Sequence, residues 1–98
     1  MHHVTVAGDL RHLVPIFLGN RGKELEALRA ALVAANYELL RQLGSRMKGV
    51  GIPYGFQRIS DLGEHVVTGA EAQDRAALET TITEYAGYLA GLQVGYAD

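Results

Sequence analysis

The chain contains no cysteine, and this absence excludes several kinds of chemistry. Without a thiol among its 98 residues, it forms no disulfide and offers neither a thiolate nucleophile nor a cysteine zinc site. Long apolar runs are also missing, since none approaches the roughly 18 residues that a membrane-spanning helix needs. No signal-peptide pattern opens the sequence. We therefore expect a cytoplasmic protein that does not insert into a membrane.

An excess of positive charge is missing as well. The formal net charge is −2, from 9 Lys and Arg against 11 Asp and Glu, and the two signs are interspersed. This pattern has no basic stripe for a nucleic-acid backbone and no cationic face for anionic lipid. Two adjacent histidines, His2 and His3, are too few to indicate a metal site. We expect no nucleic-acid partner, metal or cofactor.

The composition that remains is that of a folded globular protein. Hydrophobic residues make up 48% of the chain and charged residues 20%, which is far from the composition of disordered proteins. A chain of this length supports a single core, and its composition does not shift along the sequence. We expect a single domain spanning residues 1–98.

The first helical pattern covers residues 10–35. Its apolar residues recur at spacings of three, four and seven, as on one face of an amphipathic helix. Asp9 is placed to cap its N-terminus, and Pro15 suits a first turn or a kink. Because Gly19 and Gly22 each weaken a helix by about 1 kcal/mol relative to Ala, we expect a bend there, or a split into two helices.

The second helical pattern runs from Tyr37 to about Val50. Asn36 is a favourable N-cap for it, and the Gly51-Ile52-Pro53 segment ends it, because proline lacks an N–H donor and restricts the residue before it.

Two more helical patterns follow. One begins at Phe56 and is expected to stop at Gly69, where glycine favours termination. The other is capped by Asp74 and extends its apolar positions to Leu92. With no strand pattern in competition, these segments predict an all-α fold, an up-and-down antiparallel four-helix bundle with short links.

Ser45 lies on the polar side of the second helical pattern. At about 100° per residue, the apolar residues of this pattern lie almost opposite Ser45, whereas Arg41, Lys48 and Gly49 fall within about 60° of it. Such a group suits an incoming anion, because Lys48 supplies a point charge and Gly49 leaves room for close approach. A solvated helix face with no further role is the alternative. The expected partner-binding residues are Arg41, Gln42, Ser45, Arg46, Lys48 and Gly49.

Three segments carry a resemblance to a known family. They are Leu43-Gly44-Ser45-Arg46-Met47-Lys48-Gly49, the following Ile52-Pro53-Tyr54-Gly55-Phe56, and the earlier Phe17-Leu18-Gly19-Asn20-Arg21. Together they resemble histidine phosphotransfer (HPt) domains, in which His, two spacer residues, Lys and Gly lie on one exposed helix face before a Tyr-Gly-Phe-like turn. The resemblance covers nearly the whole chain and implies an HPt-like helical bundle in a two-component phosphorelay.

Ser45 occupies the position of the phosphoacceptor histidine in that resemblance, with Lys48 and Gly49 as the neighbours of the phosphoryl group. Imidazole supplies an unprotonated nitrogen near neutral pH and returns the phosphoryl group readily, whereas serine needs a general base and forms a stable ester. The resemblance therefore implies a pseudo-HPt module that is not an enzyme and is inactive as a carrier. It would dock a response-regulator receiver domain, with a hybrid histidine kinase as a second candidate partner.

Other interpretations remain open from the sequence. The serine can be an engineered replacement in an authentic phosphotransfer domain, or the bundle can serve as a scaffold or oligomerisation module unrelated to phosphorelay. The Ser45-x-x-Lys48 spacing also matches penicillin-recognising enzymes, but their companion motifs are missing and the chain is too short for their fold. His12 and His65 are solitary, and we expect His65 to lie at the surface.

Overall fold

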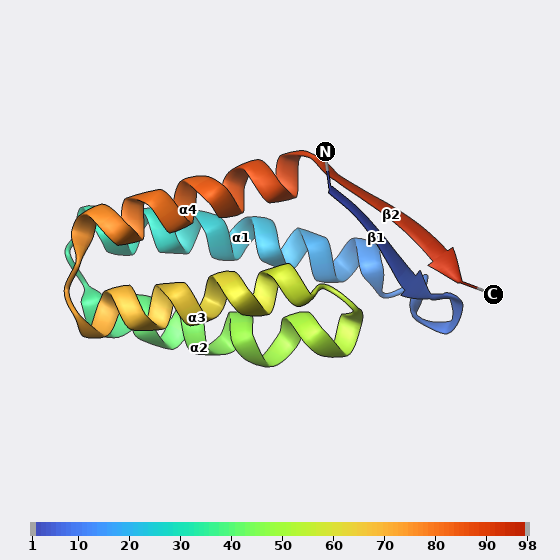
Figure 1. Ribbon diagram of the computed structural model, residues 1–98, viewed down its shortest axis with the longest axis horizontal. Helices are drawn as coiled ribbons and strands as arrows, with labels where there is room; N and C mark the ends of the chain where they lie inside the picture. The colour runs from blue at the N-terminus through green and yellow to red at the C-terminus, as the bar shows by residue number, and fades with distance from the viewer. Residues whose placement is uncertain (1, 98) are drawn as a thin grey trace.

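The structure, a computed structural model, describes residues 2–97. Within this range the chain forms four α-helices, two short 3-10 helices and two short strands (Figure 1). Their order is β1 (His2–Ala7), η1 (Gly8–Leu10), α1 (Val14–Val33), α2 (Tyr37–Gly51), η2 (Ile52–Tyr54), α3 (Gln57–Glu71), α4 (Arg75–Ala90) and β2 (Leu92–Ala97).

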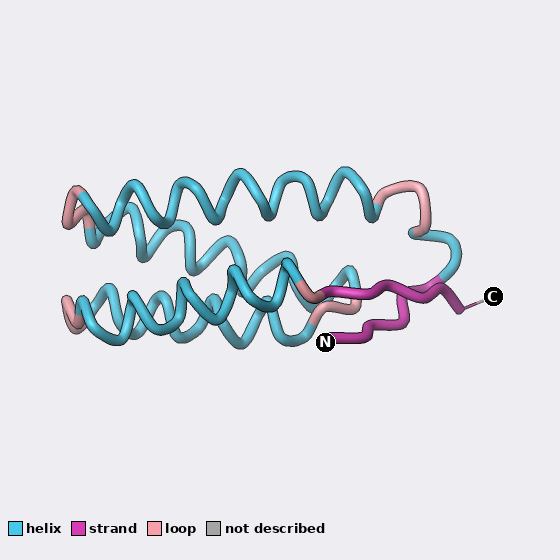
Figure 2. The backbone as a smooth tube through the Cα atoms, turned by 90° about the horizontal axis from the view of Figure 1, so that it is seen from above, coloured by secondary structure: helices cyan, strands magenta, loops and turns pink. Residues whose placement is uncertain are grey.

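The four α-helices lie side by side along the long axis of the molecule (Figures 1 and 2). Their apolar side chains form a continuous core to which every α-helix contributes. Leu28, Leu40, Leu62 and Tyr85, one from each α-helix, are fully buried. Burial of such side chains is the main stabilising contribution to the fold, at about 1.5–3 kcal/mol for each large apolar residue. The expected four-helix architecture is therefore present.

The links before α2 and α4 share one construction. Ala35 and Gln73 adopt positive φ angles of 53° and 51°, and the next backbone N–H donates to a carbonyl oxygen five residues back, from Asn36 to Ala31 (2.8 Å) and from Asp74 to Gly69 (2.9 Å). This is the Schellman arrangement that ends a helix.

Each of these links also begins the next helix. The side chain of Asn36 accepts a hydrogen bond from the Leu39 amide, and that of Asp74 accepts one from the Ala77 amide, both at 3.1 Å. The two N-caps predicted from the sequence are thus confirmed. Each link thus combines the end of one helix with the N-cap of the next in a few residues. The short links keep α1 beside α2 and α3 beside α4.

The start of α1 differs from the expectation. Asp9 lies within η1 rather than capping α1, which begins at Val14 after Leu13, with Pro15 in its first turn. Proline favours this place because it has no N–H to leave unbonded. The predicted split at Gly19 and Gly22 is wrong, since α1 is continuous from Val14 to Val33. Tertiary packing of its buried face outweighs the weak helix propensity of two glycines.

The end of α3 also differs from the expectation. The helix passes through Gly69 and stops at Glu71. A Cβ atom on Gly69 would lie 3.1 Å from the side chain of Leu78, so this glycine lets α4 approach closely instead of ending α3. The chain leaves the helical path at Gln73 instead, because this residue adopts a positive φ angle.

The two strands correct the all-α expectation. β1 and β2 pair in parallel, from His2 opposite Leu92 to Ala7 opposite Ala97. Leu92 is therefore the first residue of β2 and not part of the last helix. The strands extend beyond one end of the helices (Figure 2), where Val6 is buried at 1% exposure. The alternation of Val4 with Val6 and of Val94 with Tyr96 is the local pattern that indicates strands here, and the helical interpretation overlooked it.

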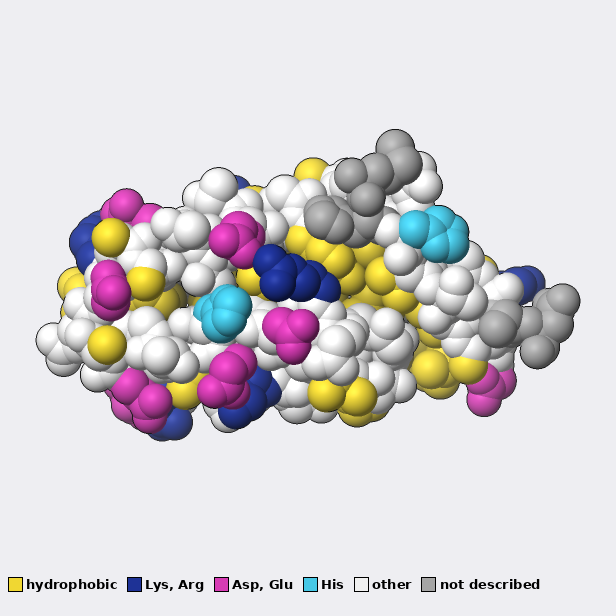
Figure 3. Space-filling model, viewed as in Figure 1, with side chains coloured by type: hydrophobic (Ala, Val, Ile, Leu, Met, Phe, Trp, Pro, Cys, Tyr) yellow, Lys and Arg dark blue, Asp and Glu magenta, His cyan; other side chains and the backbone are white. Residues whose placement is uncertain are grey.

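Charged side chains of both signs are scattered over the face of the molecule shown in Figure 3. No helix within residues 2–97 combines the length and apolar character that crossing a bilayer requires.

Candidate functional site

Ser45 lies on the solvent side of α2. We call the six residues Arg41, Gln42, Ser45, Arg46, Lys48 and Gly49 the Ser45 face. Five of them are exposed, and Arg41 is half-buried. On the opposite side of α2, Leu40, Leu43 and Met47 are buried in the core. The helical period thus brings all six residues to one accessible surface, as the sequence predicted for their positions.

The backbone of α2 is held directly against α3. A Cβ atom on Gly44 would lie 2.9 Å from the Gly63 carbonyl oxygen, and one on Gly63 would lie 2.6 Å from the Gly44 carbonyl oxygen. Only residues without a side chain permit this approach. Near the end of α2, the Ser60 hydroxyl donates to the Lys48 carbonyl oxygen and accepts from the Ile52 amide, each at 3.0 Å. The helix that carries the Ser45 face is therefore fixed to its neighbour at two points.

Two cations of the Ser45 face are paired with carboxylates. Lys48 Nζ forms an ion pair with Glu64 Oε2 on α3. Arg41 contacts both oxygens of Glu38, and these hydrogen bonds hold the pKa of Glu38 below its ordinary value. Because both pairs are largely exposed, each contributes little to stability. The pairs place a carboxylate beside Arg41 and another beside Lys48. Because Glu64 lies on α3, the period of α2 alone could not reveal it.

Exposed apolar side chains extend the accessible surface toward η2. Ile52 follows Gly49 by three residues and is 57% exposed, and Ile16 on α1 is 65% exposed. The ring of Phe17, next to Ile16, stacks on Tyr54 with centroids 4.3 Å apart. This stack brings the start of α1 to the end of the bundle where η2 lies.

The Ser45 face has no group suited to nucleophilic phosphoryl transfer. It contains no imidazole, and His12 and His65 are exposed on other segments, as expected for His65. The neighbouring carboxylates of Glu64 and Glu38 are engaged with Lys48 and Arg41. A hydroxyl without a base is a poor nucleophile. In the described part of the chain, no cluster of three His, Asp or Glu side chains is arranged to hold a metal ion.

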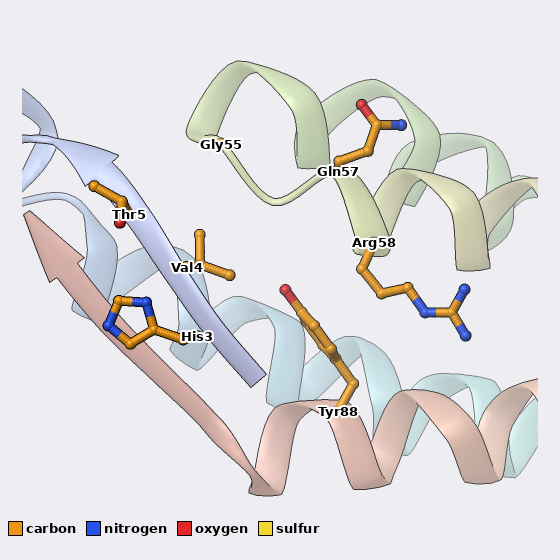
Figure 4. Close-up of a pocket in the computed structure, with 7 residues that line it drawn as sticks. All are labelled: His3, Val4, Thr5, Gly55, Gln57, Arg58 and Tyr88. Carbon is orange, nitrogen blue, oxygen red and sulfur yellow. The ribbon is translucent and has the colours of Figure 1, made fainter. Parts of the chain in front are cut away.

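A separate cavity of about 530 Å³ lies between β1, the start of α3 and α4. Figure 4 shows Tyr88 extending from α4 toward the space between β1 and α3, with Gln57 and Arg58 on the α3 side. Arg58 donates to Glu84 at 2.8 Å, and burial raises the pKa of Tyr88. This cavity contains no residue of the Ser45 face, so the two surfaces are distinct.

No family model matches the chain, and no curated protein or solved structure gives a significant match. The resemblance to HPt domains therefore depends on the residues that carry it.

Proposed function

We propose that this protein is an HPt-like module that docks a response-regulator receiver domain without relaying a phosphoryl group. The observation that carries the proposal is the Ser45 face: an exposed helix surface with a serine in the acceptor position and the Lys-Gly pair one turn later. The proposed fold is the up-and-down antiparallel bundle of HPt domains, with an added pair of strands at one end.

Docking and phosphoryl transfer depend on different parts of such a surface. Docking needs an accessible area with matching shape, and here Ile52, three residues after Gly49, supplies an exposed apolar contact at the end of the Ser45 face. Transfer needs an imidazole nitrogen that attacks an aspartyl phosphate and then releases the phosphoryl group. A serine at position 45 leaves the docking surface in place but supplies no imidazole nitrogen. A phosphoserine ester would also be too stable to pass its phosphoryl group onward.

The firm contact between α2 and α3 supports a docking role. The Gly44 and Gly63 backbones touch, so the Ser45 face cannot shift relative to α3 without a loss of packing. A preformed surface loses less conformational entropy when a partner binds. The Lys48–Glu64 pair lies across the same two helices and adds charges at the edge of the surface.

NMR titration with the receiver domains of the source organism tests docking. We expect shifts in the amides of residues 41–52 with at least one receiver. Ile52→Asp should weaken this binding at least about tenfold, as expected for a buried interface anchor. Val33→Asp is the matched control, because Val33 is 79% exposed and lies at the far end of α1. If no receiver shifts these amides, or if both variants weaken binding equally, receiver docking at this face is wrong.

Phosphotransfer assays test the role of Ser45. A phosphorylated receiver should transfer no label to the chain with Ser45 and should label Ser45→His. Transfer by the histidine variant alone would support both the HPt-like geometry and the loss of the acceptor. Failure of Ser45→His to accept label from every receiver that binds would favour a scaffold unrelated to phosphorelay.

A further inference from the structure

A cavity of about 320 Å³ lies between α1 and α2, beside the Ser45 face. Its volume falls near the lower end of the roughly 300–1,000 Å³ typical of small-molecule sites. Its polar lining residues come from both helices, and only two of its residues are apolar. The lining residues are Asn20, Arg21, Lys23, Glu24, Ala27, Leu43 and Arg46.

Positive charge concentrates in this cavity. Six of the nine Lys and Arg side chains form ion pairs with carboxylates of the described residues. Lys23 and Arg46 are outside these pairs, and both line the cavity. With Arg21, three cations face a single carboxylate, Glu24, which gives a formal charge of 3 − 1 = +2. Elsewhere on the helices the cations are neutralised by neighbours.

Arg21 lines the cavity with unused hydrogen-bond donors. The residue is only 7% exposed, and its guanidinium lies 4.9 Å above the Phe17 ring. Its Nε is 3.6 Å from a Glu24 oxygen, too far for a hydrogen bond. Neither Nε nor Nη1 has an acceptor among the described residues. Buried donors without an acceptor are rare in folded proteins, and a bound anion would satisfy them.

Glu24 does not supply that partner, because it is engaged elsewhere. Its Oε1 accepts a hydrogen bond from the Tyr85 hydroxyl on α4 at 3.0 Å. Burial raises the pKa of Glu24, and the opposing effects of Arg21, Tyr85 and Arg46 do not cancel this rise. Glu24 therefore leaves the Nε and Nη1 donors of Arg21 without an acceptor, and Lys23 and Arg46 form no ion pair among the described residues.

We infer that this cavity binds an oxyanion of the phosphate class, either inorganic phosphate or a small phosphate monoester. A phosphate group carries close to two negative charges at neutral pH and three acceptor oxygens, which match the net charge of the cavity. The planar guanidinium of Arg21 can donate two parallel hydrogen bonds to such a group. Lys23 on α1 and Arg46 on α2, which line the same cavity, would contact the remaining oxygens. This site does not depend on receiver docking.

NMR titration of the isolated protein at constant ionic strength tests the site. Inorganic phosphate should shift the amides of residues 20–27 and 43–46 in a saturable manner. Glycerol phosphate is tested in parallel. Tighter binding of glycerol phosphate than of inorganic phosphate indicates a monoester site, and the reverse order indicates a site for the free ion. Acetate tests the class of ligand, and sodium chloride tests general screening. Equal binding of acetate, or equal shifts with chloride, would overturn the assignment.

Substitutions locate the site. Arg46→Gln and Lys23→Gln should each weaken phosphate binding about tenfold, the effect of losing one charge-assisted contact. Arg29→Gln is the matched control, because Arg29 pairs with Glu26 on the exposed side of α1 and neither lines the cavity nor belongs to the Ser45 face. Arg21→Gln should abolish binding, and because it also removes a buried ion pair, its folding is checked by circular dichroism. Unchanged affinity in both Arg46→Gln and Lys23→Gln would refute the inference.

Discussion

The backbone contact between α2 and α3 predicts opposite effects for two glycine substitutions. A Cβ atom on Gly63 would lie 2.6 Å from the Gly44 carbonyl oxygen, while ordinary van der Waals contact begins at 3.4 Å. The helices would have to separate locally by about 3.4 − 2.6 = 0.8 Å. Gly87, within α4, has no heavy atom within 4 Å of the same built position. The methyl group added by Gly63→Ala would collide with backbone atoms of α2, whereas the methyl group added by Gly87→Ala would enter open space.

The magnitudes follow from two competing effects. Replacing glycine by alanine inside a helix contributes about 1 kcal/mol of helix propensity. Overpacking costs about 1–3 kcal/mol, and Gly63→Ala should fall toward the upper end because fixed backbone atoms cannot rotate away. We therefore expect Gly63→Ala to lower the free energy of unfolding by about 1–2 kcal/mol. Gly87→Ala should raise it by about 0.5–1 kcal/mol.

Urea unfolding followed by circular dichroism measures both changes. For a domain of this size, 1 kcal/mol corresponds to about 4–8 °C in Tm, so the melting temperatures should move in opposite directions. Stabilisation by Gly63→Ala equal to that by Gly87→Ala would refute the close contact. Reduced receiver binding by Gly63→Ala, with Gly87→Ala unaffected, would link this contact to the Ser45 face.

Three further predictions concern the interior and the helix links. Gln73→Gly should stabilise the protein by about 1 kcal/mol in urea unfolding, because glycine accepts the positive φ of 51° without strain; Ala72→Gly, at φ −82°, should destabilise it instead. Tyr85→Phe removes the hydrogen bond to the Glu24 carboxylate and should cost about 1.5–3 kcal/mol, and an unchanged urea midpoint would contradict this. Burial raises the pKa of Glu24 above 4.5, so the folded state keeps this proton after the unfolded state has released it. The stability of the unsubstituted chain relative to Glu24→Gln should therefore decrease as pH rises from about 4.5 through the folded pKa. A difference that increases over this window would contradict the burial effect.

The helices could be predicted where a local side chain determines their ends. Asn36 and Asp74 cap α2 and α4 through hydrogen bonds three residues away, within reach of a sequence pattern. Gly69 misled the prediction because its effect depends on Leu78 of the neighbouring helix. Gly19 and Gly22 instead face open space, and α1 continues through them because its other face is buried. A glycine that ends a helix and one that admits another helix look alike in the sequence.

The same distinction between local sequence patterns and contacts between helices applies to the candidate site. The exposure of Ser45 follows from the period of one helix and was predictable. Glu64 reaches Lys48 from a different helix, and the cluster of Arg21, Glu24 and Tyr85 joins α1 to α4. Contacts between residues so distant in the sequence depend on packing, which no local pattern encodes. Ile52 could have been identified, because it continues the polar side of α2 by three residues from Gly49.

The parallel pairing of β1 with β2 has a consequence for the order of folding events. The paired positions His2 and Leu92 are separated by 92 − 2 = 90 residues, so nearly the whole chain forms the loop that this pairing closes. A pair of short strands gains too little to offset that closure entropy alone. The bundle must first bring both segments together, and strand amides should gain protection from hydrogen exchange only after the helices have assembled. Protection of β1 during refolding thus reports completion of the native topology.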